Sequence, residues 1–180
     1  MKGVVFTEFL DMVESRFSAD MVDDIIDDAD LPSAGAYTAI GTYPHEEIVA
    51  LVGALSQRSG MAVPDLLRAY GQHLFDRFVV GYPAFFAEAR DAFSFLAGIE
   101  SIIHAEVRKL YPDAELPHFE VERSGDAQLV LIYDSRRHFE DLAEGLMQGC
   151  VTHFGGGIDI RRELLGEGDA RKERFTLTRQ

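Results

Sequence analysis

Residues 128–137 read Gln-Leu-Val-Leu-Ile-Tyr-Asp-Ser-Arg-Arg, an apolar run that leads into three polar residues at alternate positions: Tyr133, Ser135 and Arg137. The apolar part has the composition of a β-strand, and so has the preceding run from His118 to Glu122. Turn residues at 124–126 lie between the two runs, so we expect them to pair as a hairpin. The second half of the chain therefore contains a sheet.

Downstream of this hairpin the pattern changes to a helix and then returns to strands. Apolar residues recur at helical spacing between Phe139 and Phe154, and the glycines at 155–157 are suited to end that helix. Two more short runs of strand composition follow, at 158–160 and 174–178. The order after residue 117 is β-β-α-β-β.

Upstream of the hairpin the first 110 residues have helical periodicity. We expect helices over about 6–17, 20–28, 44–59, 64–80 and 91–110, with Ser18 or Asp20 as a cap and a loop at 31–41. The fold class is α+β in one domain, 1–180. We expect a helical N-terminal lobe of about residues 1–60, and a second lobe of about 61–180 with a four-stranded antiparallel sheet and packed helices.

The charge of the chain excludes some classes of partner. Seventeen basic and 31 acidic side chains give a net charge of −14, and residues 1–60 alone hold 11 acidic and 3 basic groups. Such a surface repels nucleic acids and anionic membranes, so we expect neither as a partner. No apolar run approaches the ~20 residues of a membrane span. The acidic face is either a solvated surface or one that steers a basic partner.

Two further features bear on location and redox chemistry. The first acidic residue, Glu8, comes too early for a signal peptide, so we expect a cytoplasmic protein. The lone Cys150 excludes an intramolecular disulfide and a cysteine-rich zinc site. Because Cys150 lies in an apolar helical run, we interpret it as a small buried side chain, with a redox-active thiol as the alternative.

His104 differs from the other five histidines because its neighbours Ile99, Ile102, Ile103 and Val107 are apolar. It is either a core histidine with its hydrogen bonds satisfied or a ligand of a bound group. Thirteen Phe and six Tyr in a chain without Trp favour the second interpretation, since a flat apolar cofactor needs flat apolar walls. An imidazole in such a pocket is a natural axial ligand for haem iron.

The triplet Tyr133, Ser135 and Arg137 suits an anion. On a strand these positions share one face, so their polar tips would converge on the carboxylates at a porphyrin edge. The alternative is a strand end with a phenol at its rim and an arginine in solvent. A hydrolase built from Ser135, His138 and Asp141 is disfavoured, because nothing like a nucleophile elbow surrounds the serine.

Together these segments resemble a known family. The stretch 103–107, Ile-His-Ala-Glu-Val, leads to Leu116-Pro117 and then to Tyr133-x-Ser135-x-Arg137, and this order is similar to the haem nitric oxide/oxygen binding (H-NOX) family. The best-known relative is the haem domain of soluble guanylate cyclase. The resemblance extends to residues 1–3, 69–71 and 143–146, so it covers essentially the whole chain.

The resemblance implies a haem b held between the two lobes and a role for each matching residue. His104 would be the proximal iron ligand, and Pro117 would press on the porphyrin and hold it out of plane. Tyr133, Ser135 and Arg137 would bind the haem propionates. The distal pocket would be formed by Val5, Phe9, Leu74, Leu142 and Leu146.

The distal pocket also indicates the gas. Oxygen-binding members of the family donate a hydrogen bond to dioxygen from a tyrosine in the helix after the triplet. Matching Gly145 to the family's glycine places Leu142 at that position, and leucine cannot donate. This implies that NO binds, with CO also possible, and that oxygen is excluded. Tyr70 and His73 leave this open, because either side chain could point into the pocket.

The resemblance further implies a sensor and not an enzyme. NO opposite His104 would weaken the His104–iron bond, and the resulting conformational shift would be detected by a partner. We expect no output domain fused to this domain, and therefore a signal that acts in trans on a histidine kinase or a cyclic-di-GMP enzyme. The alternative is a haem-free module of the same fold that binds another ligand or a protein.

Overall fold

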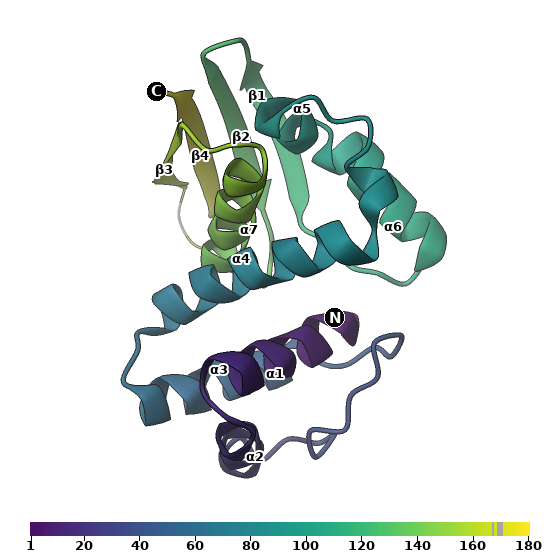
Figure 1. Ribbon diagram of the computed structural model, residues 1–180, viewed down its shortest axis with the longest axis vertical. Helices are drawn as coiled ribbons and strands as arrows, with labels where there is room; N and C mark the ends of the chain where they lie inside the picture. The colour runs from purple at the N-terminus through teal and green to yellow at the C-terminus, as the bar shows by residue number, and fades with distance from the viewer. Residues whose placement is uncertain (167, 169–170) are drawn as a thin grey trace.

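The computed structural model describes residues 1–166, 168 and 171–180. Within these ranges the chain combines helices with one four-stranded antiparallel sheet, which confirms the α+β prediction (Figure 1). The helices are α1 (Val4–Arg16), α2 (Ala19–Asp28), α3 (His45–Ser59), α4 (Val63–Gly81), α5 (Ala92–Ala97), α6 (His104–Leu110) and α7 (Glu140–His153), with a 3₁₀ turn η1 (Pro83–Phe85) and a π-helical stretch η2 (Ile99–Ile103). The strands are β1 (His118–Ser124), β2 (Gln128–Asp134), β3 (Ile158–Leu165) and β4 (Lys172–Arg179).

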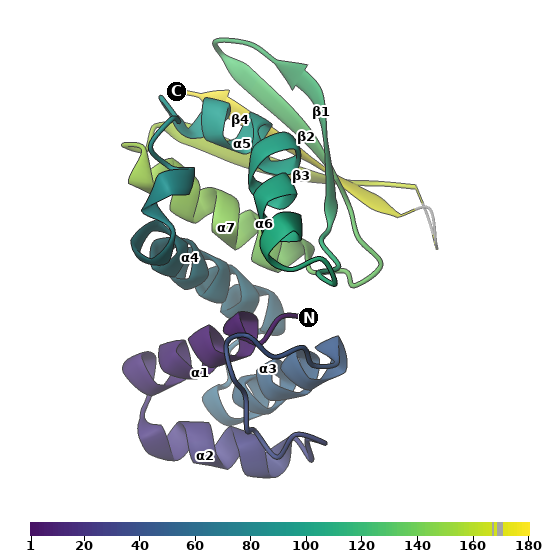
Figure 2. The ribbon, with the colours of Figure 1, turned by 90° about the vertical axis from the view of Figure 1, so that its right-hand side faces the viewer.

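The sheet has the order β1-β2-β4-β3, and each neighbouring pair is antiparallel. The pairing of β1 with β2 confirms the hairpin expected around residues 124–126. Figure 2 shows α5, α6 and α7 on one side of this sheet. Alternate residues of β2, namely Leu129, Leu131 and Tyr133, are buried in a cluster with residues of α5 and α7. The period-two pattern therefore directs this face of the strand toward the helices.

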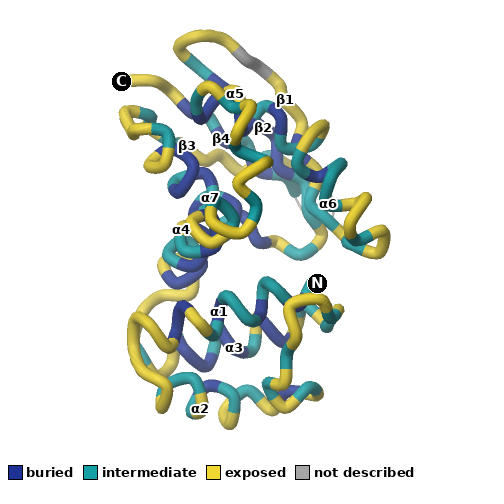
Figure 3. The backbone as a smooth tube through the Cα atoms, turned by 45° about the vertical axis from the view of Figure 1, so that its right-hand side comes forward, coloured by how far each residue is buried: buried dark blue, intermediate teal, exposed yellow. Residues whose placement is uncertain are grey.

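The apolar side chains form two clusters, and α4 contributes to both. Leu66, Leu67, Tyr70 and Leu74 pack in the first cluster with α1, α2 and α3, while Phe75 packs in the second with the sheet, α5 and α7. The buried backbone of α4 and α7 is visible between the two lobes in Figure 3. The boundary near residue 60 stays a prediction.

Glycines allow the backbones of α4 and α7 to touch. A Cβ atom on Gly145 would lie 2.2 Å from the carbonyl oxygen of Arg68, and one on Gly71 would lie 2.4 Å from that of Leu142. Contacts under 3 Å are not tolerated by real side chains, so any larger residue here must separate the helices. Helix α7 is thereby fixed against α4, and through α4 to the helical lobe.

Several predicted helix ends are confirmed by local chemistry. Ser18, and not Asp20, caps α2, since its side chain accepts a hydrogen bond of 3.1 Å from the backbone of Met21. Gly60 ends α3 in the left-handed conformation, at φ 73°. None of the helices in the described residues is long and apolar enough to cross a membrane.

The expected continuous helix over 91–110 is wrong. Asp91 caps α5, which ends at Gly98, and the chain then passes through the π-helical η2 before α6 begins at His104. In η2 the hydrogen bonds span five residues, so the backbone N–H of His104 donates to the carbonyl of Ile99. Apolar periodicity continues through this irregularity, which is why the sequence pattern did not predict it. The π stretch changes the direction in which the side chain of His104 projects from the helix axis.

Candidate functional site

The His104 side chain is buried, with 9% of the residue exposed, and it uses one ring nitrogen for a hydrogen bond. Its Nδ1 lies 3.0 Å from Oε2 of Glu100, one helical turn earlier. Among the described residues none hydrogen-bonds to Nε2. Burial is the main cause that lowers the pKa of His104, and Glu100 opposes it. The neutral ring, with a lone pair on Nε2, is the form that binds a metal.

Glu100 has hydrogen bonds on both carboxylate oxygens. Arg108 donates to Oε1 at 2.8 Å, and the backbone N–H of Phe119 donates to Oε2 at 3.2 Å. Burial raises the pKa of Glu100, but the hydrogen bonds from Arg108, His104 and Phe119 outweigh burial and lower the pKa to about 2. A charged carboxylate can only accept, so Nδ1 of His104 is the donor.

The sequence reasoning missed Glu100, although a signal was available. A glutamate four residues before a histidine on a helix lies on the same face and can reach its ring. Histidines that bind metals usually donate their second ring nitrogen to a carboxylate or a carbonyl. This spacing at Glu100 and His104 was the cue.

Phe119 connects His104 to Tyr133. The ring centroids of His104 and Phe119 are 5.9 Å apart, and those of Phe119 and Tyr133 are 5.3 Å apart. Tyr133 is buried, and burial is the main cause that raises its pKa to about 12. The structure therefore places two predicted site residues, from α6 and β2, next to the same aromatic ring.

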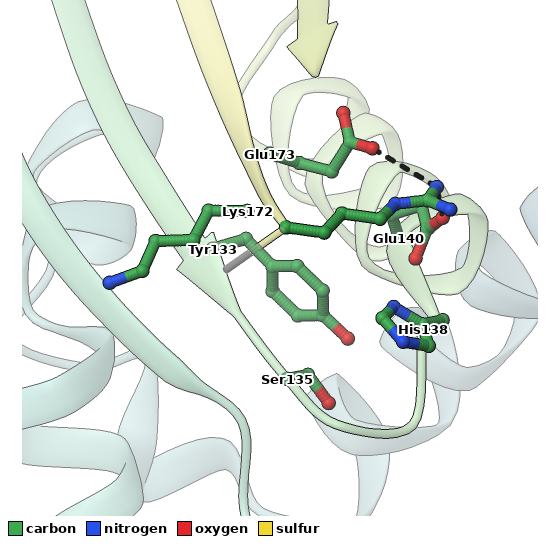
Figure 4. Close-up of a pocket in the computed structure, with 7 residues that line it drawn as sticks. Tyr133, Ser135, His138, Glu140, Lys172 and Glu173 are labelled. Atoms are coloured by element: carbon green, nitrogen blue, oxygen red, sulfur yellow. Dashed lines mark hydrogen bonds and ion pairs between the residues drawn. The ribbon is translucent and has the colours of Figure 1, made fainter. Parts of the chain in front are cut away.

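The expectation that the triplet shares one strand face is wrong. Strand β2 ends at Asp134, so Ser135 and Arg137 lie in the turn that follows, where Ser135 Oγ accepts from the backbone N–H of Arg137 at 3.2 Å. The serine hydroxyl favours a local turn over a longer strand. Tyr133 and Ser135 still point into the same shallow polar pocket (Figure 4). Its other lining residues are His138, Glu140, Arg171, Lys172 and Glu173.

Arg137 lies apart from this pocket and faces the segment before β1. Its Nη1 donates to the carbonyl oxygen of Glu115 at 3.0 Å, and its Nη2 to the Glu115 carboxylate. The Arg137 side chain is 17% exposed, whereas that of Glu115 is 82% exposed. An ion pair with so exposed a partner contributes little to stability, so another carboxylate can replace Glu115 at the guanidinium. This contact also places Arg137 near Pro117, which is half-buried in the same segment.

The residues present fit a haem. One buried imidazole has its second nitrogen fixed by a carboxylate, leaving Nε2 for iron. Aromatic rings adjoin it, and the Arg137 guanidinium can accept a propionate. Within the described residues no group of three or more His, Cys, Asp and Glu side chains is placed to hold a metal ion. A single-histidine iron porphyrin needs no such group.

The five residues expected in the distal pocket gather where α1, α4 and α7 meet. Phe9 and Leu74 are buried in the first cluster, and Val5, Leu142 and Leu146 pack against it. All five side chains are apolar. Their role toward a bound gas stays a prediction.

The side chains of Tyr70 and His73 both face groups on α1. The Tyr70 hydroxyl donates to the backbone carbonyl of Val5, and burial raises the pKa of this fully buried phenol. His73 faces a charged group on α1, with Nε2 3.8 Å from Oε2 of Glu8, and burial is the main cause that lowers its pKa. The hydroxyl of Tyr70 is thus occupied, and His73 lies beside charged side chains.

The hydrolase alternative and the redox alternative find no geometric basis. Asp141 accepts from Arg68 at 2.7 Å and from Arg162 at 2.8 Å. Its carboxylate is therefore paired with these two arginines and not with His138. Cys150 is fully buried, and burial raises the pKa of its thiol to about 12. A thiol of so high a pKa is a poor nucleophile, as expected for a small packed side chain.

Comparison with known proteins gives a consistent result over the whole chain. Residues 2–162 match the haem-NO-binding family. The H-NOX protein of K. algicida in the unliganded Fe(II) state has a TM-score of 0.94 at 42% identity, covering 100% of this chain and 97% of that one. The S. oneidensis H-NOX protein in the Fe(II)NO state has 0.91 at 28%, covering 100% and 99%.

A third solved structure is the H-NOX protein of Shewanella woodyi bound to IWP-051 in the Fe(II)CO state. It has a TM-score of 0.85 at 38% identity and covers 100% of this chain and 95% of that one. No curated protein matches the chain. The family and the fold therefore come from the family match and from the solved structures.

Proposed function

The chain belongs to the haem-NO-binding family, the H-NOX proteins, and from this premise we propose that it senses nitric oxide at a ferrous haem and excludes oxygen. The family consists of haem-based gas sensors and not of catalysts. The observation that carries the proposal is His104, a buried imidazole with Nδ1 held by Glu100 and with Nε2 left for iron.

The cofactor we propose is haem b, held between the helical lobe and the sheet lobe. When bound, it would supply a ferrous iron that holds a small gas ligand. His104 of α6 would hold that iron, and Pro117, in the segment before β1, would press on the porphyrin. Tyr133, Ser135 and Arg137 bind the propionates, with Arg137 exchanging the exposed Glu115 carboxylate for a propionate.

The choice of NO rests on the apolar distal side. Bound dioxygen carries negative charge and is stabilised by a hydrogen-bond donor, whereas NO and CO depend on one much less. Leu142 cannot donate, and the Tyr70 hydroxyl already donates to Val5. Solved relatives from S. oneidensis and Shewanella woodyi are in NO and CO states, which supports these two gases as ligands here.

Signalling begins at His104. NO at the iron would weaken the hold of His104 Nε2 on the cofactor and would free α6, which starts at His104. The helical lobe would then shift relative to the sheet lobe, and a partner in trans would detect the change. A histidine kinase or a cyclic-di-GMP enzyme is the partner class that we propose. The acidic surface argues against nucleic acid and anionic membranes as partners, and we place the protein in the cytoplasm.

A His104→Gly substitution tests the cofactor site. The purified variant should lose its haem absorption band and regain it when the protein is expressed with imidazole, which replaces the missing ring. His73→Gln is the matched control, because it removes a histidine beside Glu8 and should retain haem. Full haem retention with an unchanged spectrum in His104→Gly would contradict the proposal. A wild-type protein that stays colourless with ample haem would instead favour a haem-free module.

A further inference from the structure

We propose that Glu100 is a positioning residue for the iron ligand, which orients the ring of His104 and connects it to the start of β1. This inference rests on the proposed function, since it concerns the same histidine. It goes further because it assigns which side chain holds the ring and names β1 as the element that is affected first when the ring is released. Glu100 does not touch the cofactor in this assignment and acts through His104.

The orientation of the ring follows from one contact. Nδ1 of His104 donates to Oε2 of Glu100 at 3.0 Å, which fixes the proton on Nδ1 and leaves the lone pair on Nε2. A negative acceptor on Nδ1–H also makes the opposite nitrogen a stronger electron donor to a metal. The carboxylate should therefore strengthen the bond from His104 to iron.

The carboxylate is itself held from two elements. Arg108 on α6 fixes Oε1 at 2.8 Å, and the Phe119 backbone N–H on β1 fixes Oε2 at 3.2 Å. Nδ1 of His118, also on β1, lies 3.5 Å from the same oxygen. Oε2 thus receives hydrogen bonds from the ligand ring and from the first strand.

The π-helical stretch explains how one side chain reaches both. Glu100 belongs to η2, where the helix is wider than an α-helix, and α6 begins at His104. The segment packs against β1, as the ring contact between His104 and Phe119 also indicates. If a released His104 ring moves, its Nδ1–H withdraws from Oε2, and the carboxylate loses one of the hydrogen bonds that fix it beside the Phe119 amide. Release of the ligand would therefore loosen the first residues of β1.

The test compares four ferrous unliganded proteins by resonance Raman spectroscopy: wild type, Glu100→Gln, Glu100→Ala and the control Glu106→Gln. Glu106 is on α6, the helix of His104, and pairs only with the exposed Lys109 among the described residues. The iron–histidine stretching frequency should fall from wild type to Glu100→Gln and further to Glu100→Ala, and stay unchanged in Glu106→Gln. Haem affinity should fall by about tenfold in Glu100→Ala.

A second measurement follows the connection to β1. Amide hydrogen exchange at Phe119 should be faster in Glu100→Ala than in wild type, and NO should accelerate it in wild type but not in Glu100→Ala. Glu100→Gln keeps the side-chain shape and an acceptor oxygen, so the inference can be tested even where the alanine variant is unstable.

The outcomes separate the two claims. A wild-type protein with haem but no iron–histidine stretch would contradict the proposed function itself. A wild-type stretch that stays at the same frequency in both Glu100 variants would overturn the positioning role while leaving His104 as the ligand. A merely structural role would lower the melting temperature of the variants without moving that frequency. Unchanged exchange at Phe119 would overturn the connection to β1.

Discussion

The two sides of the proposed haem site use their polar groups in opposite ways. Around α6 and the β1–β2 hairpin, His104 is fixed by Glu100, and Arg137 faces a replaceable carboxylate. Where α1, α4 and α7 meet, the side chains are apolar and the nearby Tyr70 hydroxyl is occupied by Val5. In the function that we propose, the first side holds the cofactor by directed bonds. The other side offers a small gas molecule no hydrogen-bond donor, and we propose that this difference selects the ligand.

Removing Arg137, the side chain that we propose binds the propionates on the polar side, should have the largest effect. Arg137→Ala should weaken haem binding by about 10- to 100-fold, since a hydrogen bond to a charged group contributes about 1.5–3 kcal/mol. Haem transfer to apomyoglobin measures this directly. Arg137→Lys keeps the charge but loses the bidentate geometry, so its affinity should be intermediate. If Arg137→Ala binds haem as tightly as wild type, the propionate role is wrong.

Adding a donor to the apolar side should remove the difference between the two sides. Leu142→Tyr should produce a ferrous protein that binds oxygen in air, with dissociation slowed about 10- to 100-fold relative to Leu142→Phe, because the hydroxyl can donate to the partly negative dioxygen. Stopped-flow spectroscopy after a CO chase gives the rate. If the tyrosine and phenylalanine variants behave alike, residue 142 does not reach the gas.

Forcing helices α4 and α7 apart should lower the free energy of unfolding. Gly145→Ala places a Cβ against the backbone of Arg68 in α4, and we expect unfolding free energy to fall by about 1–3 kcal/mol. Gly53→Ala is the control, since a Cβ there meets nothing within 4 Å in the middle of α3 and should raise stability by about 0.5–1 kcal/mol. Urea denaturation measures both variants. Equal effects would mean that the α4–α7 contact adapts easily.

The smallest effect concerns the Tyr70 hydroxyl, a polar group near the apolar side. Tyr70→Phe deletes the hydroxyl that donates to Val5 and should lower stability by about 1 kcal/mol. Neither CO affinity nor the absence of an oxygen complex should change. A marked change in CO affinity would mean that this hydroxyl acts on the bound gas.

The two regions also differ in how far the sequence predicts them. The β1–β2 hairpin, α7 and the helices of the N-terminal lobe follow from the spacing of apolar residues and from turn chemistry, because the residues that form each element are neighbours in the chain. The break at Gly98 and the π stretch before His104 were not predictable, since the apolar spacing continues unchanged through both. The sequence predicts the end of the second strand near Tyr133, and β2 ends at Asp134. It did not predict that a turn bond at Ser135 takes Ser135 and Arg137 off the strand face.

The site residues show the same limit. His104 and Tyr133 could be chosen from sequence by their residue types and neighbours. Their approach through Phe119 depends on how α6 lies across the hairpin, which no local pattern encodes. The pairing of Arg137 with Glu115 is likewise a contact across 22 positions of the chain. Of the contacts that were missed, the one between Glu100 and His104 could have been predicted from their spacing of four residues.

The most direct test of the account is the absorption spectrum of the ferrous protein, recorded unliganded, in air and with NO. We expect a haem band that converts with NO to the spectrum of a five-coordinate nitrosyl complex, because His104 leaves the iron, and that forms no oxygen complex in air. A stable oxygen complex would contradict the role given to Leu142. A nitrosyl complex that keeps six ligands would contradict the release of His104.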